Sequence, residues 1–186
     1  MRHAKSGSWW ETDPQRALSN NSVCYTEKPD IGTFMREWVA LYDSKSGERG
    51  IFNRQAAQVQ AAKYERREQD IQYGTNPCSE IILRPKQFCN LSEVVVRDTD
   101  TIETLEKKIE LATILGTIQS CFTSLKGLSS QWTKNTEEER LLGVSLTGIM
   151  DNAMMSNKTN DDLGLILNAL REHAVSVNKL WAKKLG

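Results

Sequence analysis

The stretch GTNPCSEIILRPKQFCNLSEV, residues 74–94, places an amide, a thiol and a carboxylate at alternating positions, followed by a second thiol. These four side chains belong to Asn76, Cys78, Glu80 and Cys89. In an extended backbone, residues i, i+2 and i+4 project to one side, and Pro77 biases the residue before it toward extended geometry. We therefore predict that Asn76, Cys78 and Glu80 share one face of an extended segment.

Such a face would combine three kinds of chemistry. The thiol can be oxidised, the carboxylate can take a proton, and the amide both donates and accepts hydrogen bonds. The LRPKQ turn leaves enough chain for Cys89 to return near this face on the next strand. The spacing alone favours a structural role over a catalytic one, because cysteine is commonly a small buried hydrophobe and Asn and Glu commonly face solvent.

Helical and extended patterns alternate on both sides of this stretch. Apolar spacing and composition predict helices over about 31–42, 54–70, about 102–126, 137–142 and about 160–185, and strands over 51–54, 88–98 and 143–150. Strands separated by helices predict parallel pairing through crossovers, hence an α/β sheet or barrel. Three strands cannot close a barrel, so either the sheet is small or part of it is missing.

Several local features refine these predictions. Asp100 followed by Glu103 predicts the start of the long helix, and SSQWTKN (129–135) predicts a polar turn after it. Cys121 is expected in the core. The last helix is expected to begin at Asn160, with Asp161 and Asp162 in its first turn. Its predicted buried stripe consists of Leu163, Ile166, Leu167, Leu170, Ala174, Val177 and Trp181.

The composition bounds the classes of partner. Lys plus Arg and Asp plus Glu both total 24, so the zero net charge gives no reason to expect a nucleic acid or an anionic membrane. We find neither an apolar run long enough to span a membrane nor a signal-peptide stretch, and we predict a cytoplasmic protein with reduced thiols. The cysteines form no C-x-x-C pair and only two histidines are present, so we expect no metal bound directly by this chain.

The motif NPCSEIILRP followed by FCNLSEVVV resembles the active-site loop of ribonucleotide reductases. The likeness is greatest to the monomeric, adenosylcobalamin-dependent class, which often acts on triphosphates. It continues through RALSNNSVCYTEKPDIGTFMREW (16–38), SGERGIFNR (46–54) and NTEEERLLGVSLTGIMD (135–151), and so covers most of the chain.

The resemblance implies a role for each of the four side chains. Cys78 matches the cysteine that becomes a transient thiyl radical and removes hydrogen from the ribose 3′ carbon. Glu80 matches the carboxylate that takes the 3′-hydroxyl proton, and Asn76 matches the amide that hydrogen-bonds the ribose hydroxyls. Cys89 matches one member of the cysteine pair that supplies two electrons. The implied fold is a fragment of the family's ten-stranded α/β barrel with long helices flanking a few strands. Residues 1–186 would form one partial catalytic domain, with its active-site loop at about 74–94 and no second domain.

The resemblance also implies partners. These are a ribonucleoside di- or triphosphate, adenosylcobalamin at contacts that no motif here identifies, and a thioredoxin-type reductant for deoxyribonucleotide biosynthesis. The family's catalytic chain is several times longer, so we expect this chain to be an internal fragment or the product of one piece of a split gene, of the kind found in phages. We expect the chain to be inactive without its complementing segments. Two alternatives stay open: a large-subunit fragment of a reductase with a separate radical-generating metal subunit, and a non-catalytic remnant acting as a partner-binding module.

Overall fold

The computed structural model describes residues 3–19, 21–45, 47, 49–157 and 162–186. Helices and short strands are mixed, as expected for an α/β chain, and the chain divides into two units, Met1–Pro85 and Lys86–Gly186. In the described residues the strands form three pairs, of which β1–β2 and β5–β6 are parallel and β3–β4 is antiparallel. The parallel pairing predicted from the alternation of helices and strands is confirmed for two of these pairs.

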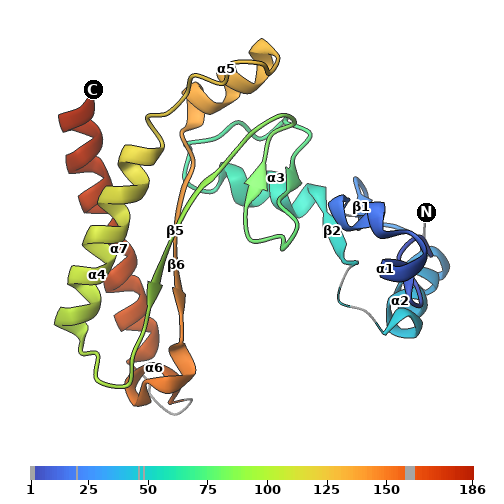
Figure 1. The fold of residues 1–186 in the computed structure, drawn as a ribbon, viewed down its shortest axis with the longest axis horizontal. Helices are drawn as coiled ribbons and strands as arrows, with labels where there is room; N and C mark the ends of the chain where they lie inside the picture. Colours follow the sequence, from blue (N-terminus) through green and yellow to red (C-terminus); the bar gives the residue numbers. More distant parts are fainter. Residues whose placement is uncertain (1–2, 20, 46, 48, 158–161) are drawn as a thin grey trace. The chain divides into compact units, whose positions relative to one another are not determined.

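The first unit is built around a short parallel pair and a hairpin (Figure 1). Its elements are α1 (Trp9–Thr12), η1 (Pro14–Leu18), β1 (Val23–Tyr25), α2 (Ile31–Ser44), β2 (Ile51–Asn53), α3 (Arg54–Ala62), β3 (Gly74–Thr75) and β4 (Ile82–Leu83). Helix α2 is the crossover between β1 and β2. Ala57 and Ala61 of α3 bury themselves against Tyr73, which forms the small core of this unit.

The starts of α2 and α3 follow from their capping residues. Asp30 accepts a hydrogen bond from the Thr33 N–H at 2.9 Å, and Asn53 accepts one from the Ala56 N–H at 3.0 Å. The predicted helix over 54–70 is too long, because Glu65 adopts a left-handed conformation with φ 54° soon after α3 ends. Residues 62–70 include helix-forming residues, but none of their apolar side chains joins the Tyr73 core, whose next apolar contact along the chain is Ile71.

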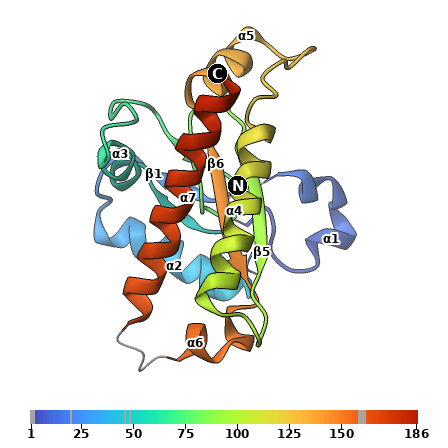
Figure 2. The same ribbon diagram turned by 90° about the vertical axis from the view of Figure 1, so that its left-hand side faces the viewer.

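The second unit is a parallel pair of strands with two long helices on one face, and Figure 2 shows α4 and α7 side by side in front of β5 and β6. Its elements are β5 (Asn90–Val95), α4 (Ile102–Gln119), α5 (Ser130–Glu139), β6 (Leu142–Thr147), η2 (Ile149–Asp151), α6 (Ala153–Ser156) and α7 (Leu163–Leu185). The register runs from Asn90 opposite Leu142 to Val95 opposite Thr147. Its buried core consists of Val94, Val96, Leu105, Ile109, Ala112, Met155 and Leu170.

Gly116 lets α4 lie close to the strands. A Cβ atom at this position would lie 2.1 Å from Leu142 Cδ1, far inside van der Waals contact. The Ser92 hydroxyl donates to the Ala112 carbonyl oxygen at 2.9 Å and ties β5 to the same stretch of helix. The close approach therefore depends on the missing side chain at position 116.

Helix α4 begins at Ile102 as predicted, but its capping residues and its end differ from the prediction. The N-cap is Thr101, whose side chain and that of Thr104 each accept from the other's backbone N–H, whereas we predicted a signal from Asp100 and Glu103. The helix ends at Gln119 instead of about 126, since residues beyond Gly116 pass the start of β6 and have no strand to cover. Cys121, predicted in the core, is half-buried after the helix end and donates to the Thr117 carbonyl oxygen.

Helix α5 occupies most of the segment that we predict as a polar turn, and the helix predicted over 137–142 is correct for residues 137–139 and wrong for residues 140–142. Arg140 ends α5 in a left-handed conformation, φ 42°, and Leu142 already pairs with β5. The buried residues of α5 are polar: Asn135 and Thr136. The helix is held by hydrogen bonds at Asn135 and by a single ring contact between Trp132 and Phe88, and not by an apolar stripe, so hydrophobic periodicity does not detect it.

Helix α7 follows the prediction for most of its length. Leu170 and Val177 are buried, and Leu163, Ile166 and Ala174 pack against the core. Leu167 was predicted in the buried stripe but is 41% exposed. The described part of the helix begins at Leu163, and the predicted start at Asn160 and Asp161 lies outside the described residues.

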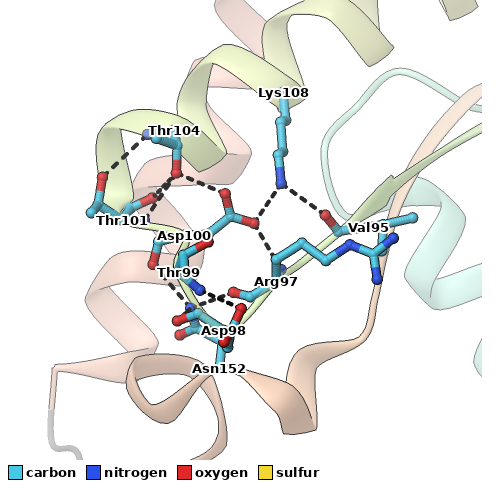
Figure 3. Close-up of polar contacts among 9 residues, drawn as sticks. All are labelled: Val95, Arg97, Asp98, Thr99, Asp100, Thr101, Thr104, Lys108 and Asn152. Carbon is cyan, nitrogen blue, oxygen red and sulfur yellow. Dashed lines mark hydrogen bonds and ion pairs between the residues drawn. The ribbon is translucent and has the colours of Figure 1, made fainter.

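A polar cluster centred on Asn152 joins the segments that follow β5 and β6 (Figure 3). The Asn152 side chain is 1% exposed. Its amide nitrogen donates to the carbonyl oxygens of Arg97 and Asp100, both at 2.9 Å, and to that of Asp98 at 3.4 Å. Its oxygen accepts from the N–H groups of Met154 and Met155, which caps α6. One side chain thus satisfies five backbone groups from two loops.

Asp100 forms the other half of this Asn152 cluster. Its carboxylate accepts from Lys108, from the Arg97 N–H at 2.8 Å and from the Thr104 hydroxyl at 2.9 Å. Lys108 also donates to the Val95 carbonyl oxygen at 3.0 Å. The hydrogen bond from Lys108, followed by those from Arg97 and Thr104, lowers the pKa of Asp100 from 3.8 to about 2.

We predict an acid-dependent loss of stability through Asp100. A carboxyl group whose folded-state pKa is depressed contributes stability above its unfolded pKa and loses it as the pH falls through the folded one. The contribution should therefore fade between about pH 4 and about pH 2. Urea denaturation across this range should show a shallower pH dependence in Asp100→Asn than in the unchanged chain. An identical slope in both would assign the acid sensitivity to other carboxyls.

Two glycine substitutions should have opposite effects on stability. Gly148 has φ 73°, and a Cβ there would lie 2.5 Å from the Val96 carbonyl oxygen, so Gly148→Ala should destabilise by about 2 to 4 kcal/mol. Gly164 in α7 has nothing within 4 Å of the corresponding position, so Gly164→Ala should stabilise by about 0.5 kcal/mol. Urea denaturation midpoints measure both effects, and equal effects would contradict the close approach at Gly148.

Candidate functional site

The motif N-P-C-S-E forms the tip of a β-hairpin. Strands β3 and β4 pair Gly74 with Leu83 and Thr75 with Ile82. The Asn76 N–H continues the ladder by donating to the Ile81 carbonyl oxygen at 3.3 Å. The chain reverses between these partners, so residues 77–80 form the connecting loop.

This turn corrects the prediction of an extended face. The Ser79 N–H donates to the Asn76 carbonyl oxygen at 3.0 Å, which closes a four-residue turn, and Ser79 is left-handed with φ 66°. Proline is favoured at the second position of such turns, where its fixed φ already fits. Pro77 thus initiates a reversal instead of prolonging a strand. The turn signal was present in the sequence, but we weighed only the extended bias that proline imposes on Asn76.

The reversal brings two of the predicted site residues into contact. The Asn76 side-chain amide donates to the Glu80 carboxylate, and the Asn76 oxygen accepts from the Ile81 N–H at 3.1 Å. Cys78 lies between them in the chain, at the tip of the turn, and its side chain is exposed. The amide and carboxylate are therefore paired, and the exposed Cys78 thiol lies between them in the sequence on the same turn.

The base of the hairpin is fixed to α3 through Tyr73, which is fully buried. The Arg54 side chain donates to the Tyr73 carbonyl oxygen at 2.7 Å. Arg67 donates to the Ile82 carbonyl oxygen at 2.9 Å while its guanidinium lies 4.8 Å from the centre of the Tyr73 ring. These hydrogen bonds attach both sides of the hairpin to residues of the first unit, at the end opposite the loop.

Cys89 lies in the second unit, immediately before β5, and is half-buried. The residues before it are anchored to α5: the Gln87 amide donates to the Asn135 carbonyl oxygen at 3.3 Å, and the Phe88 ring stacks on Trp132 with centroids 4.6 Å apart. Cys78 belongs to the first unit, so the predicted proximity of the two sulfurs stays a prediction.

Other polar groups in the described residues are less suited to a reaction. The Asn152 cluster lies where β5 and β6 end, a common location for sites in α/β folds, but its amide and the carboxylate of Asp100 are engaged by groups of the protein. Cys24 is exposed on β1, and the Cys121 thiol lies 3.8 Å from an Arg140 guanidinium nitrogen. Within the described ranges, His, Cys, Asp and Glu side chains do not gather in threes that could hold a metal ion.

None of the helices in the described part of the chain has the length and apolar character that a membrane span requires. Comparison of the chain with protein-family models, with curated proteins and with solved structures finds no match. The assignment of a function therefore depends on the hairpin and on the motif that it carries.

Proposed function

We propose that this chain is a catalytic-core part of a ribonucleotide reductase of the adenosylcobalamin-dependent type. The observation that carries the proposal is the contact between the Asn76 amide and the Glu80 carboxylate on a hairpin whose exposed tip bears Cys78. The family motif requires these three groups to act on one ribose. A loop that pairs two of them and presents the third supports that use.

The fold supports the proposal at a coarser level. In the second unit, β5 and β6 are parallel and connected through α4, with α4 and α7 covering one face. Parallel strands with helices on their outer face are the repeating unit of α/β barrels. We propose that this pair corresponds to neighbouring strands of the family's ten-stranded barrel.

Each side chain has a defined task in the proposed reaction. The Cys78 sulfur, after losing its hydrogen atom to a radical source, takes the hydrogen atom from C3′ of the ribose and leaves a carbon radical there. Glu80 takes the proton of the 3′-hydroxyl, which assists loss of the 2′-hydroxyl as water. Asn76 donates to a ribose hydroxyl and holds Glu80 in place. Cys89 and a second cysteine give one proton to the departing 2′-hydroxyl, one hydrogen atom to C2′ and one electron to the C3′ ketone, and end as a disulfide that a thioredoxin-type reductant returns to thiols. Glu80 gives its proton back to the 3′ oxygen, and Cys78 returns the hydrogen atom to C3′, which regenerates the thiyl radical.

The radical source in the proposed class is adenosylcobalamin, which supplies a carbon radical when bound. The corrin ring of a cobalamin already holds its cobalt, so the cofactor does not require a cluster of protein ligands, and none of the described residues is matched to it by the motif. We therefore assign no residue to the cofactor and derive no step through it. Cys78 is exposed at its loop tip, so its sulfur is accessible to a radical source that lies outside these residues.

The experiment that tests the proposal is a hybrid reductase. In it, residues 1–186 replace the corresponding stretch of a monomeric adenosylcobalamin-dependent reductase. We expect the hybrid to form deoxyribonucleotides from ribonucleoside triphosphates when given adenosylcobalamin and a dithiol. The isolated chain, given the same reagents, should form none.

Two further arms separate the alternatives. A hybrid that works only within a reductase whose radical comes from a metal-bearing subunit would move the chain to that class. Hybrids that fold, as judged by circular dichroism and sizing, but are inactive in both settings would refute the reductase function.

A further inference from the structure

The loop tip depends on an unusual backbone conformation at a residue that is not glycine. Ser79 has φ 66°, a region that costs most side chains energy because Cβ approaches the following carbonyl oxygen. Its N–H donates to the Asn76 carbonyl oxygen at 3.0 Å, and its hydroxyl lies 3.4 Å from the Thr75 hydroxyl. These two contacts hold the serine in the left-handed conformation.

The φ angle of Ser79 determines how the residues on either side of Cys78, Asn76 and Glu80, are placed relative to each other. With Ser79 left-handed, the chain turns back immediately after Cys78, so that Ile81 reaches Asn76 and the Glu80 carboxylate meets the Asn76 amide. With Ser79 extended, Glu80 would continue away from Asn76 and the pair would separate. The conformation of residue 79 thus decides whether the carboxylate and the amide lie together beside the thiol.

We propose that Ser79 is a positioning residue for Cys78 and Glu80, and that its task is to keep the backbone left-handed. The expected effect of Ser79 on turnover rests on the proposed function. Its effect on the conformation of the loop does not. The serine hydroxyl contributes through its contact with the Thr75 hydroxyl, and we assign it no part in the chemical steps. Glycine, which adopts this conformation without steric cost, should therefore replace serine.

The test compares Ser79→Gly with Ser79→Val, whose branched side chain strongly disfavours positive φ. In the purified 186-residue chain, hydrogen exchange by NMR reports the closed turn through the Ile81 N–H, which donates to Asn76. We expect its protection to fall at least about tenfold in Ser79→Val and to stay within about twofold in Ser79→Gly. In the hybrid reductase, kcat should follow the same order with KM little changed, because the reacting groups are displaced and the binding of the nucleotide is retained.

Glu65→Val is the matched control. Glu65 is exposed, belongs to the same unit and is also left-handed with φ 54°, but it lies after α3 and away from the loop tip. This variant should lose stability like Ser79→Val and keep both Ile81 protection and kcat. Equal losses of Ile81 protection and of kcat in Ser79→Gly and Ser79→Val would show that the serine hydroxyl, and not the backbone conformation, is required, and would overturn the proposal. Unchanged exchange in Ser79→Val, or a kcat loss in Glu65→Val as large as that in Ser79→Val, would also overturn it.

The exchange measurement on the isolated chain and the kcat measurement on the hybrid distinguish the positioning role of Ser79 from the proposed reductase function. An inactive hybrid with unchanged sequence refutes the reductase function, whereas the exchange measurement in the isolated chain still decides whether Ser79 fixes the turn. An active hybrid whose kcat is insensitive to Ser79→Val refutes the positioning role and leaves the reductase function in place.

Discussion

Cys78→Ser in the hybrid reductase is expected to lower turnover by more than about 1,000-fold, equivalent to about 4 kcal/mol of activation free energy. The serine O–H bond is too strong to give up its hydrogen atom to the radical source that acts on a thiol. The substitution removes one sulfur from an exposed loop tip, so folding should be unaffected. Release of tritium from a 3′-labelled substrate measures hydrogen abstraction directly and should disappear together with product.

Two other cysteine variants, Cys89→Ser and Cys24→Ser, show whether the loss of hydrogen abstraction is specific to Cys78. Cys89→Ser should still release tritium and then stall, because hydrogen abstraction precedes the delivery of electrons. Cys24 is exposed on β1 and matches no catalytic position, so Cys24→Ser should leave kcat within about twofold of the unchanged hybrid. Normal turnover in Cys78→Ser would show that another group abstracts hydrogen, or that the reaction is of a different kind.

The second large effect concerns stability. Asn152→Asp should destabilise the chain by about 4 kcal/mol, although the two side chains have nearly the same shape. The variant keeps an oxygen that can cap α6, but it replaces the buried amide donor by a carboxylate oxygen facing the carbonyl oxygens of Arg97 and Asp100. Repulsion and the unsatisfied carbonyl groups act in the same direction. Urea denaturation at about pH 7 measures the loss.

The pH dependence of the stability loss in Asn152→Asp tests whether the charge of the new carboxylate causes that loss. A protonated carboxyl can donate one hydrogen bond, so the loss in Asn152→Asp should be smaller at about pH 5 than at about pH 7. Asn168→Asp makes the same chemical change at an exposed position of α7 and should change stability by less than about 0.5 kcal/mol. If both variants lost equally little, the buried cluster would not hold the two loops together.

The sequence predicts the elements that an apolar pattern or a strong cap specifies. Helix α2 begins after Asp30, β5 lies within the predicted strand 88–98, and β6 shares residues 143–147 with the predicted strand 143–150, because capping and branched residues act locally. Helix α5 has no apolar stripe in the sequence, because its buried residues are Asn135 and Thr136, and the Asn135 amide donates to the distant Lys86 carbonyl oxygen, a contact that only the tertiary structure sets. The strands β1, β3 and β4 have two or three residues each, too few for alternation to be visible.

The candidate site was predictable in its residue types and not in its geometry. The motif identified Asn76, Cys78 and Glu80 as a group, and Asn76 does contact Glu80. The contact arises from a reversal at Pro77, not from an extended face, because the left-handed conformation of Ser79 decides the path of the chain. Such a conformation at serine has no sequence signal comparable to that of glycine.

The contact between Gly116 and Leu142 couples two positions in evolution. Because the end of the Leu142 side chain fills the space that a Cβ at position 116 would need, a mutation that adds a side chain at 116 requires Leu142 to adopt another rotamer or to be replaced by a smaller residue. The two positions should therefore covary among descendants of this sequence, although they are separated in the chain by a helix end, a second helix and a turn.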